Sequence, residues 1–508
     1  MLVKTGIAKG EPPFAGARGV LAPSNSPWEI EVPDSAMVVE GPNPDRIPKA
    51  LENPAQAVRN AIRQPIGMKP LSELVTASSK VTIAMNDWMG VGVHAVPIVL
   101  EELRESGVEE RNIRIVIAGG LHPKVTRSEL ILSKVGRTLN PPYPSPFHIL
   151  SPEVVDRFWP TGWASSRIQP HDANDEDHLV DLGVNEMGDL VEVNDCLVES
   201  DLVIYMSGWS GVPAIWGGYL GGGQGITVGL GSARSIMTHH AYRIHEHKDS
   251  MASDAHKQLF MKHKEAWAKY AEQATGKKVF YLEGSLNVRA EFCAIFAGDG
   301  EAIREPMFAL ADSEKIVDLP TQADVFVTGA AYHGIFYDTC MNPLMSLAQL
   351  NARIREYVGE RPPLRQGGVA ILITPCDGTI DERWRPADRE LLQIFNKHGH
   401  DPSQMEDYEE EYAHREDLIF KYRYAHAAHP LHAFPVFYEN AFLFNLANRI
   451  IFCGPKSAEA ASIVGATATS TWEEAWRLAC QTVGSKEPAV MVTPNVGARM
   501  PLLWHAQA

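Results

Sequence analysis

The chain has 508 residues, of which 45% are hydrophobic and 21% charged, with a formal net charge of −17. The length favours two or three domains, and the composition is that of a globular protein with a large core. The negative balance argues against a nucleic-acid-binding surface, which needs clustered lysine and arginine. The six cysteines are scattered and form no CxxC pair, which disfavours a thiolate zinc site and a disulfide framework.

Targeting signals and membrane spans are not evident in the sequence. The first residues contain no apolar signal segment, and no apolar run reaches the roughly 20 residues that cross a bilayer. We therefore expect a cytoplasmic protein without a membrane or nucleic-acid partner. Its partner is expected to be a small-molecule substrate, and a homo-oligomer is an open option.

In chain order, residues 1–45 are rich in proline and glycine and are expected to form an extended arm. The rest alternates apolar runs with amphipathic runs. Strands are predicted over 81–85, 112–118, a run ending at 205, 278–282, 291–297, 324–329, 368–374, 449–454 and 489–494. Helices are predicted over 53–77 with proline breaks, and over 98–106, 126–134, 252–274, 344–358, 390–398 and 470–483. This alternation predicts an α/β fold with mostly parallel sheets, divided into domains 46–312 and 313–508.

Polar residues follow the first two predicted strands. Asn86 and Asp87 come after the first strand, and Gly120 and His122 come after the second. In parallel sheets, ligands bind beyond the carboxyl ends of the strands, so we expect these residues to line a site.

A glycine-rich stretch, residues 208–247, follows the strand that ends at Tyr205. Its glycines allow backbone amides to approach a bound group closely, and Ser232 is a plausible cap for the helix that follows. A glycine turn before a helix can cradle a phosphate, although a flexible glycine loop is an equal alternative. Four histidines follow, of which His245 and His247 are expected on the surface and His239 is either functional or exposed.

Five segments in order resemble the nickel-dependent lactate racemase superfamily. They are IAGGLHPKVT (117–126) with 129–130; HDAN (171–174) with 179–183; 201–204 followed by GGYLGG (217–222) and SIMTHH (235–240); FAGD (296–299); and a C-terminal segment of Gly465, 470–476 and 493–494. The resemblance implies two Rossmann-like α/β domains with an active-site cleft between them. It also implies a nickel pincer nucleotide whose pyridinium ring accepts a hydride from the substrate and returns it on either face.

The resemblance also implies roles for particular residues. His122 matches a catalytic histidine that takes the hydroxyl proton, and His240 matches the nickel ligand. Gly221, Gly222, Gly223, Gln224 and Gly225 match the nucleotide cradle. Neutral imidazole suits nickel, and histidine is a natural proton shuttle.

Several matched positions differ from the family pattern. Gln224 stands where the family has a lysine that tethers the cofactor, so a pincer nucleotide would be held non-covalently. Ala214 replaces the second catalytic histidine, and Met89 replaces the arginine that binds the substrate carboxylate. No lysine occurs from 316 through 396, where the family supplies a second substrate-binding cation.

These departures predict a substrate larger or less anionic than lactate. Its expected binding residues are Asn86, Asp87, Trp88, Met89, Trp209 and Trp216, although each tryptophan has core packing as its alternative. The second base would be replaced by one of His171, Tyr332, His333 or Tyr219, and Asp172 is a further catalytic candidate. His171 and Asp172 have a structural hydrogen-bonding role as their alternative. His426, His429 and His432 lie either near the mouth of the site or in a packed loop.

The leading hypothesis is a racemase or epimerase that acts on a hydroxyl-bearing carbon through the pincer nucleotide. One alternative is a hydrolase or lyase on the same fold, with a divalent metal or none. Another is a non-catalytic homologue that binds a ligand in the same cradle.

Overall fold

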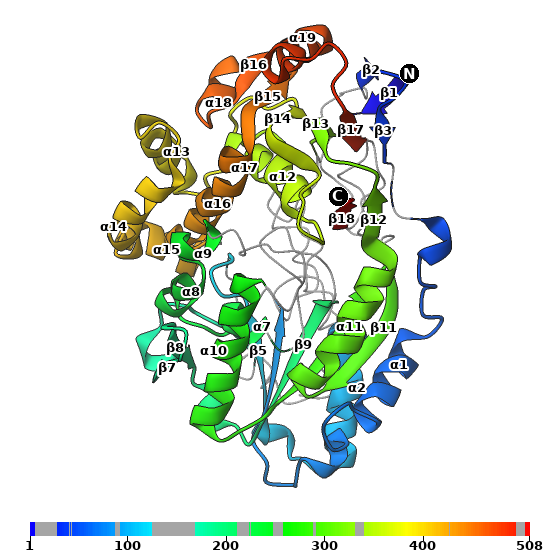
Figure 1. Ribbon diagram of the computed structural model, residues 1–508. Helices are drawn as coiled ribbons and strands as arrows, with labels where there is room; N and C mark the ends of the chain where they lie inside the picture. The colour runs from blue at the N-terminus through cyan, green and yellow to red at the C-terminus, as the bar shows by residue number, and fades with distance from the viewer. Residues whose placement is uncertain are drawn as a thin grey trace.

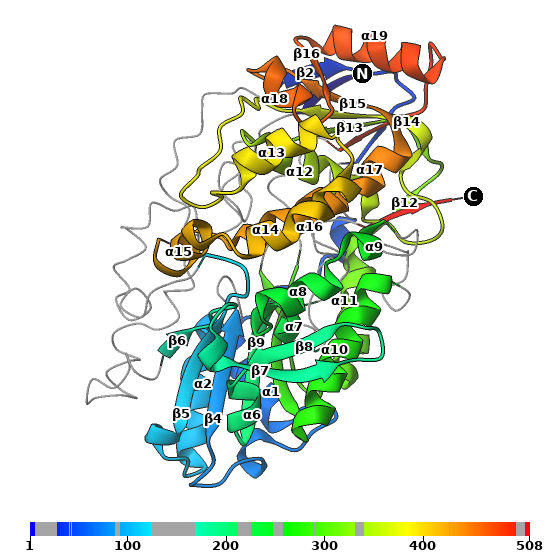
Figure 2. The ribbon, with the colours of Figure 1, turned by 90° about the vertical axis from the view of Figure 1, so that its left-hand side faces the viewer.

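The computed structural model describes residues 1–5, 28–39, 41, 43–86, 92–123, 168–210, 223, 225–246, 258–287, 291–330, 340–425, 427–493 and 503–507. Two six-stranded sheets organise this part of the chain, one in each half of the molecule (Figure 1). Figure 2 shows α8 (Ala233–His239), α14 (Glu409–Ala413) and α16 (Phe434–Glu439) between the two sheets. The α/β fold class is confirmed, whereas the domain boundaries stay a prediction.

The first sheet has the strand order β11-β10-β9-β4-β5-β6. Its strands are β4 (Val81–Asn86), β5 (Ile113–Ala118), β6 (Ile168–Pro170), β9 (Leu202–Ser210), β10 (Val279–Leu286) and β11 (Phe292–Gly298). Only β11 is antiparallel to its neighbour. The carboxyl ends of β4, β5 and β9 therefore meet at one edge, where the sequence predicted the site.

Helices cover both faces of the first sheet. One face packs on α1 (Pro54–Arg63) and α2 (Gly92–Glu105) through residues such as Ile62 and Val99. The other packs on α7 (Gly225–Gly229) and α10 (Leu259–Thr275) through Ile226 and Trp267. The remaining elements of this half are β7 (Leu179–Val184), β8 (Leu190–Asn194), α6 (Cys196–Glu199), α8 (Ala233–His239), α9 (Tyr242–His245) and α11 (Gly300–Lys315).

The second sheet has the order β16-β15-β14-β13-β17-β3 and is parallel throughout. Its strands are β3 (Met37–Val38), β13 (Ala323–Gly329), β14 (Leu364–Ile373), β15 (Ala447–Cys453), β16 (Thr467–Thr469) and β17 (Val490–Thr493). One face packs on α19 (Trp472–Val483). The other packs on α12 (Pro343–Arg355), α13 (Asp388–Lys397), α16 (Phe434–Glu439) and α17 (Ala441–Leu446).

The described chain also contains smaller elements. They are β1 (Leu2–Thr5) with β2 (Trp28–Glu31), β12 (Ile316–Leu319) with β18 (Leu503–Ala506), α14 (Glu409–Ala413), α15 (Glu416–Tyr424), α18 (Ala458–Ser462) and the 3-10 turns Pro402–Tyr408 and Pro430–Ala433. No helix among the described residues combines the length and apolarity that a membrane crossing requires.

Most predicted elements in the described ranges are confirmed. Thr471 caps α19 by accepting a hydrogen bond from the Glu474 amide, and Ser232 caps α8 in the same way through Ser235. The strand predicted at 489–494 is confirmed as β17, but it is not the last strand, because β18 follows it. The predicted helix at 126–134 lies outside the described residues.

The described part of the N-terminal segment packs into the second half of the molecule and is not the extended arm that we expected. Ile30 and Val32 are buried in the core between the second sheet and α19, and β3 pairs with β17. The described part of residues 28–38 is therefore integral to the second half of the molecule.

Two glycines of the predicted cradle are required by packing. A Cβ on Gly225 would lie 2.5 Å from a ring carbon of Tyr205, and one on Gly223 would lie 3.1 Å from Gly300. The Tyr205 hydroxyl donates to the Gly225 carbonyl, and the Tyr281 hydroxyl donates to that of Gly223. This end of the stretch is fastened to the sheet by two tyrosines.

We expect Gly225→Ala to lower the free energy of unfolding by about 1–3 kcal/mol, because the added methyl overpacks the Tyr205 ring. Gly188→Ala is the control: its φ of +83° is unfavourable for alanine, but no atom lies within 4 Å of the new Cβ. The control should cost only about 1–2 kcal/mol. Chemical denaturation measures both, and a Gly225→Ala variant as stable as wild type would contradict the packing role.

Candidate active site

His122 is presented by a tight turn at the carboxyl end of β5. Its amide donates to the Gly119 carbonyl at 2.9 Å, and its side chain is half-buried. Gly120 has a φ of +51°, and a Cβ there would collide with the Val228 carbonyl of α7. Glycine is therefore needed at 120 for the turn to pass over α7 and expose His122 at the sheet edge.

The second half of the molecule contacts this turn directly. The Tyr422 hydroxyl, on α15, donates to the Gly120 carbonyl at 2.8 Å and accepts from the Ala173 amide at 3.0 Å. The His429 amide donates to the Leu121 carbonyl at 2.9 Å. These bonds join residues far apart in the chain, so the His122 turn lies at the junction of the two halves.

His432 faces His122 from the second half. The two ring centroids lie 5.3 Å apart with the planes inclined by 60°. Burial lowers the pKa of His432 well below its usual value, and the nearby charge of Arg385 lowers it further. His122 and His240 also contribute to this lowering, so His432 is a neutral imidazole surrounded by residues of both halves.

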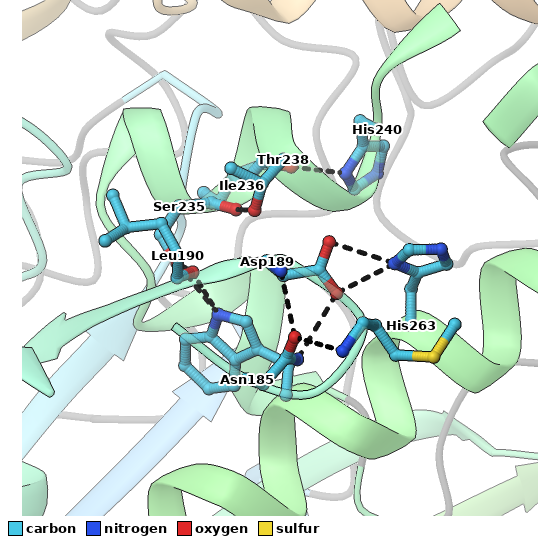
Figure 3. Close-up of polar contacts among 10 residues, drawn as sticks. Asn185, Asp189, Leu190, Ser235, Ile236, Thr238, His240 and His263 are labelled. Carbon is cyan, nitrogen blue, oxygen red and sulfur yellow. Dashed lines mark hydrogen bonds and ion pairs between the residues drawn. The ribbon is translucent and has the colours of Figure 1, made fainter. Parts of the chain in front are cut away.

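His240 lies at the carboxyl end of α8 (Figure 3). Its Nδ1 donates to the Ile236 carbonyl at 2.9 Å, which leaves the lone pair on Nε2. Burial lowers the pKa of His240 to about 3, with a smaller contribution from Lys264. A neutral ring with a fixed tautomer is the form in which histidine binds a metal.

A hydrogen-bonded layer holds α8 in place beneath His240 (Figure 3). The Trp267 indole donates to the Ser235 hydroxyl at 2.8 Å, and His263 Nδ1 donates to the Asp189 carboxylate at 2.8 Å. Asn185 Oδ1 accepts from the Asp189 amide and closes the β7–β8 turn. Trp267 and His263 both come from α10, so this helix holds α8 and the β7–β8 turn in place, and with them His240.

The expectation that His245 lies on the surface was wrong. His239 and His245 are buried, with 0% and 4% of their surface exposed. Their rings and that of His240 surround Phe260, whose ring centroid is 4.8 Å from the centroid of the His240 ring and 5.5 Å from that of His245. Helix periodicity at α9 was too short to show which face was inward. His247 lies outside the described residues.

His171 and Asp172 are engaged in structural hydrogen bonds. His171 Nε2 lies 2.9 Å from the Gly231 carbonyl, and its Nδ1 lies 3.2 Å from Asn194 Nδ2. Asp172 accepts from the Asn174 amide and pairs with Arg423 of α15 at 3.0 Å. This pattern favours the structural alternative, with Asp172 serving as a tie between the halves.

Several candidate residues lie outside the part of the chain that the structure describes. They are Asp87, Trp88, Met89, Trp216, Gly221, Gly222, Gln224, Tyr332 and His333, together with the side chains of Asn86 and Trp209. Their assignments stay predictions. Tyr219 and Ala214 lie outside it as well.

The described residues fit a nickel pincer group only through a single histidine. No cluster of three or more His, Cys, Asp or Glu that could hold a metal occurs within the described ranges. A pincer supplies most of the metal's ligands itself, so one neutral imidazole such as His240 is compatible with it. The described glycines of the cradle, Gly223 and Gly225, lie against the rings of Tyr281 and Tyr205.

Comparison with known proteins also relates the chain to lactate racemases. Residues 24–143 and 145–252 match the lactate racemase N-terminal domain. Curated lactate racemases of Thermoanaerobacterium thermosaccharolyticum and Lactiplantibacillus plantarum are 24% and 26% identical over 185 and 250 residues. Those segments cover 36% and 49% of this chain and span 37% and 51% of the relatives' own lengths.

Two solved structures share the fold. The lactate racemase apoprotein of T. thermosaccharolyticum superposes with a TM-score of 0.65 and 17% identity, covering 99% of this chain and 100% of that one. Together with the family match, these similarities support a divergent member of the lactate racemase superfamily. A Thermotoga maritima protein matches with a TM-score of 0.52 and 12% identity over 89% of this chain and 99% of that one.

Sequence reasoning gave His432 less weight than the structure does. The stretch 424–442 carries three histidines among aromatics, and only the fold shows that His432 meets His122. Arg385 was not noticed, because nothing in its local sequence indicates that it is buried. Neither residue falls in a segment that carries the superfamily resemblance, because four of those segments end by residue 299 and the fifth begins at Gly465.

We expect Tyr422→Phe to destabilise the junction between the halves. It removes the donor to Gly120 and leaves the buried Ala173 amide without its acceptor, which should cost about 1–3 kcal/mol. Tyr424→Phe is the matched control on the same helix, since Tyr424 is 69% exposed. Thermal unfolding tests the pair, and equal midpoints for the two variants would contradict the role of Tyr422.

A second group of buried charges lies where α12 meets α16. Arg355 and Glu439 form an ion pair at 3.0 Å with both side chains 1% exposed. Burial raises the pKa of Glu356 to about 7, against the opposing effect of Arg353 and Arg355. Burial also raises the pKa of Glu439 to about 8.

These shifts predict that the folded protein loses stability as pH rises. Glu356 has its ordinary pKa of 4.5 when unfolded and about 7 when folded, so between these values the folded state binds more protons. The stabilisation that Glu356 contributes to the free energy of unfolding is full below pH 4.5 and is lost as the pH rises to about 7. We therefore compare the free energy of unfolding of Glu356→Gln with that of wild type at two pH values. The difference should favour the variant more at pH 8 than at pH 5. Urea unfolding at both pH values measures this, and a pH-independent difference would contradict the shift.

Proposed function

We propose that this protein is a racemase or epimerase that acts on a hydroxyl-bearing carbon of a small molecule with a non-covalently held nickel pincer nucleotide. The observation that carries the proposal is the pair of imidazoles, His122 and His432, that face each other across the junction of the halves. The curated relatives are named lactate racemases, which supports an isomerase of this type.

His240 would hold the nickel through Nε2, because its Nδ1 is bound to the Ile236 carbonyl. When bound, the pincer nucleotide supplies a pyridinium ring that accepts a hydride from the carbinol carbon and returns it. The superfamily uses this chemistry to invert the carbon, and no other described residue is needed as a metal ligand for it.

Two imidazoles would handle the proton of the substrate hydroxyl. His122 accepts it from the oxygen when the carbonyl forms and donates it back when the alcohol is restored. His432 would take the place of the second family histidine, because its ring comes from the second half and lies 5.3 Å from that of His122. The two imidazoles come from different halves of the molecule and meet at the junction.

Met89 in place of the family arginine supports a substrate larger or less anionic than lactate. The proposed partner is this small molecule, rather than nucleic acid or a membrane. The scattered cysteines, all six of them free, support a cytoplasmic location. The proposal is compatible with either a monomer or a homo-oligomer.

The test is purification from a host that makes the pincer nucleotide, followed by metal analysis and assay of single-enantiomer 2-hydroxy compounds carrying deuterium at C2. We expect nickel in wild type, inverted product and deuterium retained at C2. His122→Gln should lower kcat by about 10²–10⁴-fold with nickel content unchanged. His240→Gln should lower nickel content, whereas the exposed His178→Gln control should change neither. Active protein without nickel, or a product of changed mass, would contradict the proposal.

A further inference from the structure

His429 is a buried histidine of the second half whose hydrogen bonds reach both halves of the molecule. It is 2% exposed, and its Nδ1 accepts from the Leu431 amide at 3.1 Å, which caps the 3-10 turn Pro430–Ala433. Burial lowers the pKa of His429 to about 3, so the ring is neutral. A neutral imidazole that accepts at Nδ1 carries its proton on Nε2. The Nε2 group therefore donates to Asn174 Oδ1 of the first half, which lies 2.9 Å away.

The backbone at His429 is also fastened to both halves. The Ala428 amide donates to the Trp384 carbonyl of the second half at 2.7 Å. The next amide, that of His429, donates at 2.9 Å to the Leu121 carbonyl, in the turn that presents His122. Because these adjacent residues bond to opposite halves, a displacement of His429 would be passed to the turn that holds His122.

The loop that supplies the acceptor for His429 is held by the same segment of the second half. Arg423 pairs with Asp172 at 3.0 Å and donates to the Asn174 carbonyl at 2.6 Å. The Tyr422 ring packs edge-on against the His429 ring, with the centroids 5.1 Å apart. Residues 422–429 therefore hold two first-half loops, 119–122 and 172–174, in one fixed arrangement, and the His429 side chain lies between them.

We propose that His429 is a positioning residue that sets the location of His122 from the second half of the molecule. The inference rests on the proposed function, in which His122 accepts the proton of the substrate hydroxyl. The side-chain bond to Asn174 fixes His429 relative to the first half, and its backbone bond to Leu121 carries that location to the turn. His122 then reaches its reacting position only when the two halves are docked in this register. A displacement of about 1 Å at such a group can cost about 100-fold in rate.

Two amide side chains separate the two tasks of the His429 ring. Asparagine places its Oδ1 where Nδ1 lies, so it can still cap the 3-10 turn, but its side chain is too short to replace Nε2. Glutamine places its amide nitrogen near Nε2 and can donate to Asn174, but it offers no acceptor at the place of Nδ1. His429→Asn therefore removes the bond across the junction, whereas His429→Gln retains it.

Hydrogen exchange followed by mass spectrometry tests the positioning without turnover, on the full chain. In His429→Asn, we expect peptides that contain residues 119–122 and 172–174 to exchange about 2-fold to 10-fold faster than in wild type, because the bond that ties both loops to the second half is lost. Asn174→Ala removes the acceptor instead of the donor and should speed exchange at 119–122 to the same extent. His429→Gln should exchange as wild type does.

Activity gives a second readout, measured on the full chain from a host that makes the pincer nucleotide, with the substrate that wild type isomerises. We expect His429→Asn and Asn174→Ala each to lower kcat by about 10-fold to 100-fold with KM unchanged, because His122 acts in the chemical step. The double variant should lose no more than either single variant, since both remove one bond. His429→Gln should keep most of the wild-type kcat.

His398→Asn is the matched control. His398 Nε2 also bonds a side chain, the Tyr408 hydroxyl at 2.9 Å, but both residues belong to the second half. The control loses an imidazole hydrogen bond without touching the junction, so it should keep the wild-type kcat and the wild-type exchange at 119–122.

Three results would overturn the inference: unchanged exchange at 119–122 in both His429→Asn and Asn174→Ala, a loss of kcat as large in His429→Gln as in His429→Asn, or an equal loss in His398→Asn. The proposed function fails separately. Faster exchange at 119–122 in variants of a protein that isomerises no hydroxyl-bearing compound would retain the contact and reject the racemase.

Discussion

One apolar core extends from the first half of the molecule into the second, and the position of the site depends on it. Leu121, Ala233 and Ile236 of the first half belong to the same buried cluster as Phe434 and Leu372 of the second. Because this core is closely packed, residues at its rim cannot shift independently. It therefore fixes the distance between the end of β5 and the segment after α15. Tyr422 and Arg423 also fix the orientation of the two halves, because Tyr422 bonds to the Gly120 carbonyl and Arg423 pairs with Asp172 across the junction.

Much of this fold could be predicted from the sequence. Runs such as those at 81–85 and 324–329 are mostly apolar because both faces of a parallel strand are covered, and they appear as β4 and β13. The end of β5 could be predicted for the same reason, and Gly120 and His122 lie there. The cap at Ser232 followed from local hydrogen bonding alone. These features depend on neighbours in the chain.

The other side of the site depends on contacts between distant segments, which no local pattern records. His432 is near His122 because residues 422–432 contact the turn after β5, and the residue before the buried Arg385 accepts a hydrogen bond from Ala428 of the same segment. The glycine stretch shows the opposite limitation. Gly225 matched a cofactor cradle by position, but in the fold its missing side chain makes room for Tyr205. A glycine indicates close approach without saying what approaches.

The central claim is that imidazoles from the two halves act on one bound molecule. The most direct measurement is a double-mutant cycle on kcat/KM with His122→Gln, His432→Gln and the combined variant, using the substrate that the wild-type protein isomerises. If the two residues act as a unit, the combined loss will be well below the product of the single losses. Losses that multiply independently, or a His432→Gln variant with wild-type activity, would contradict the account.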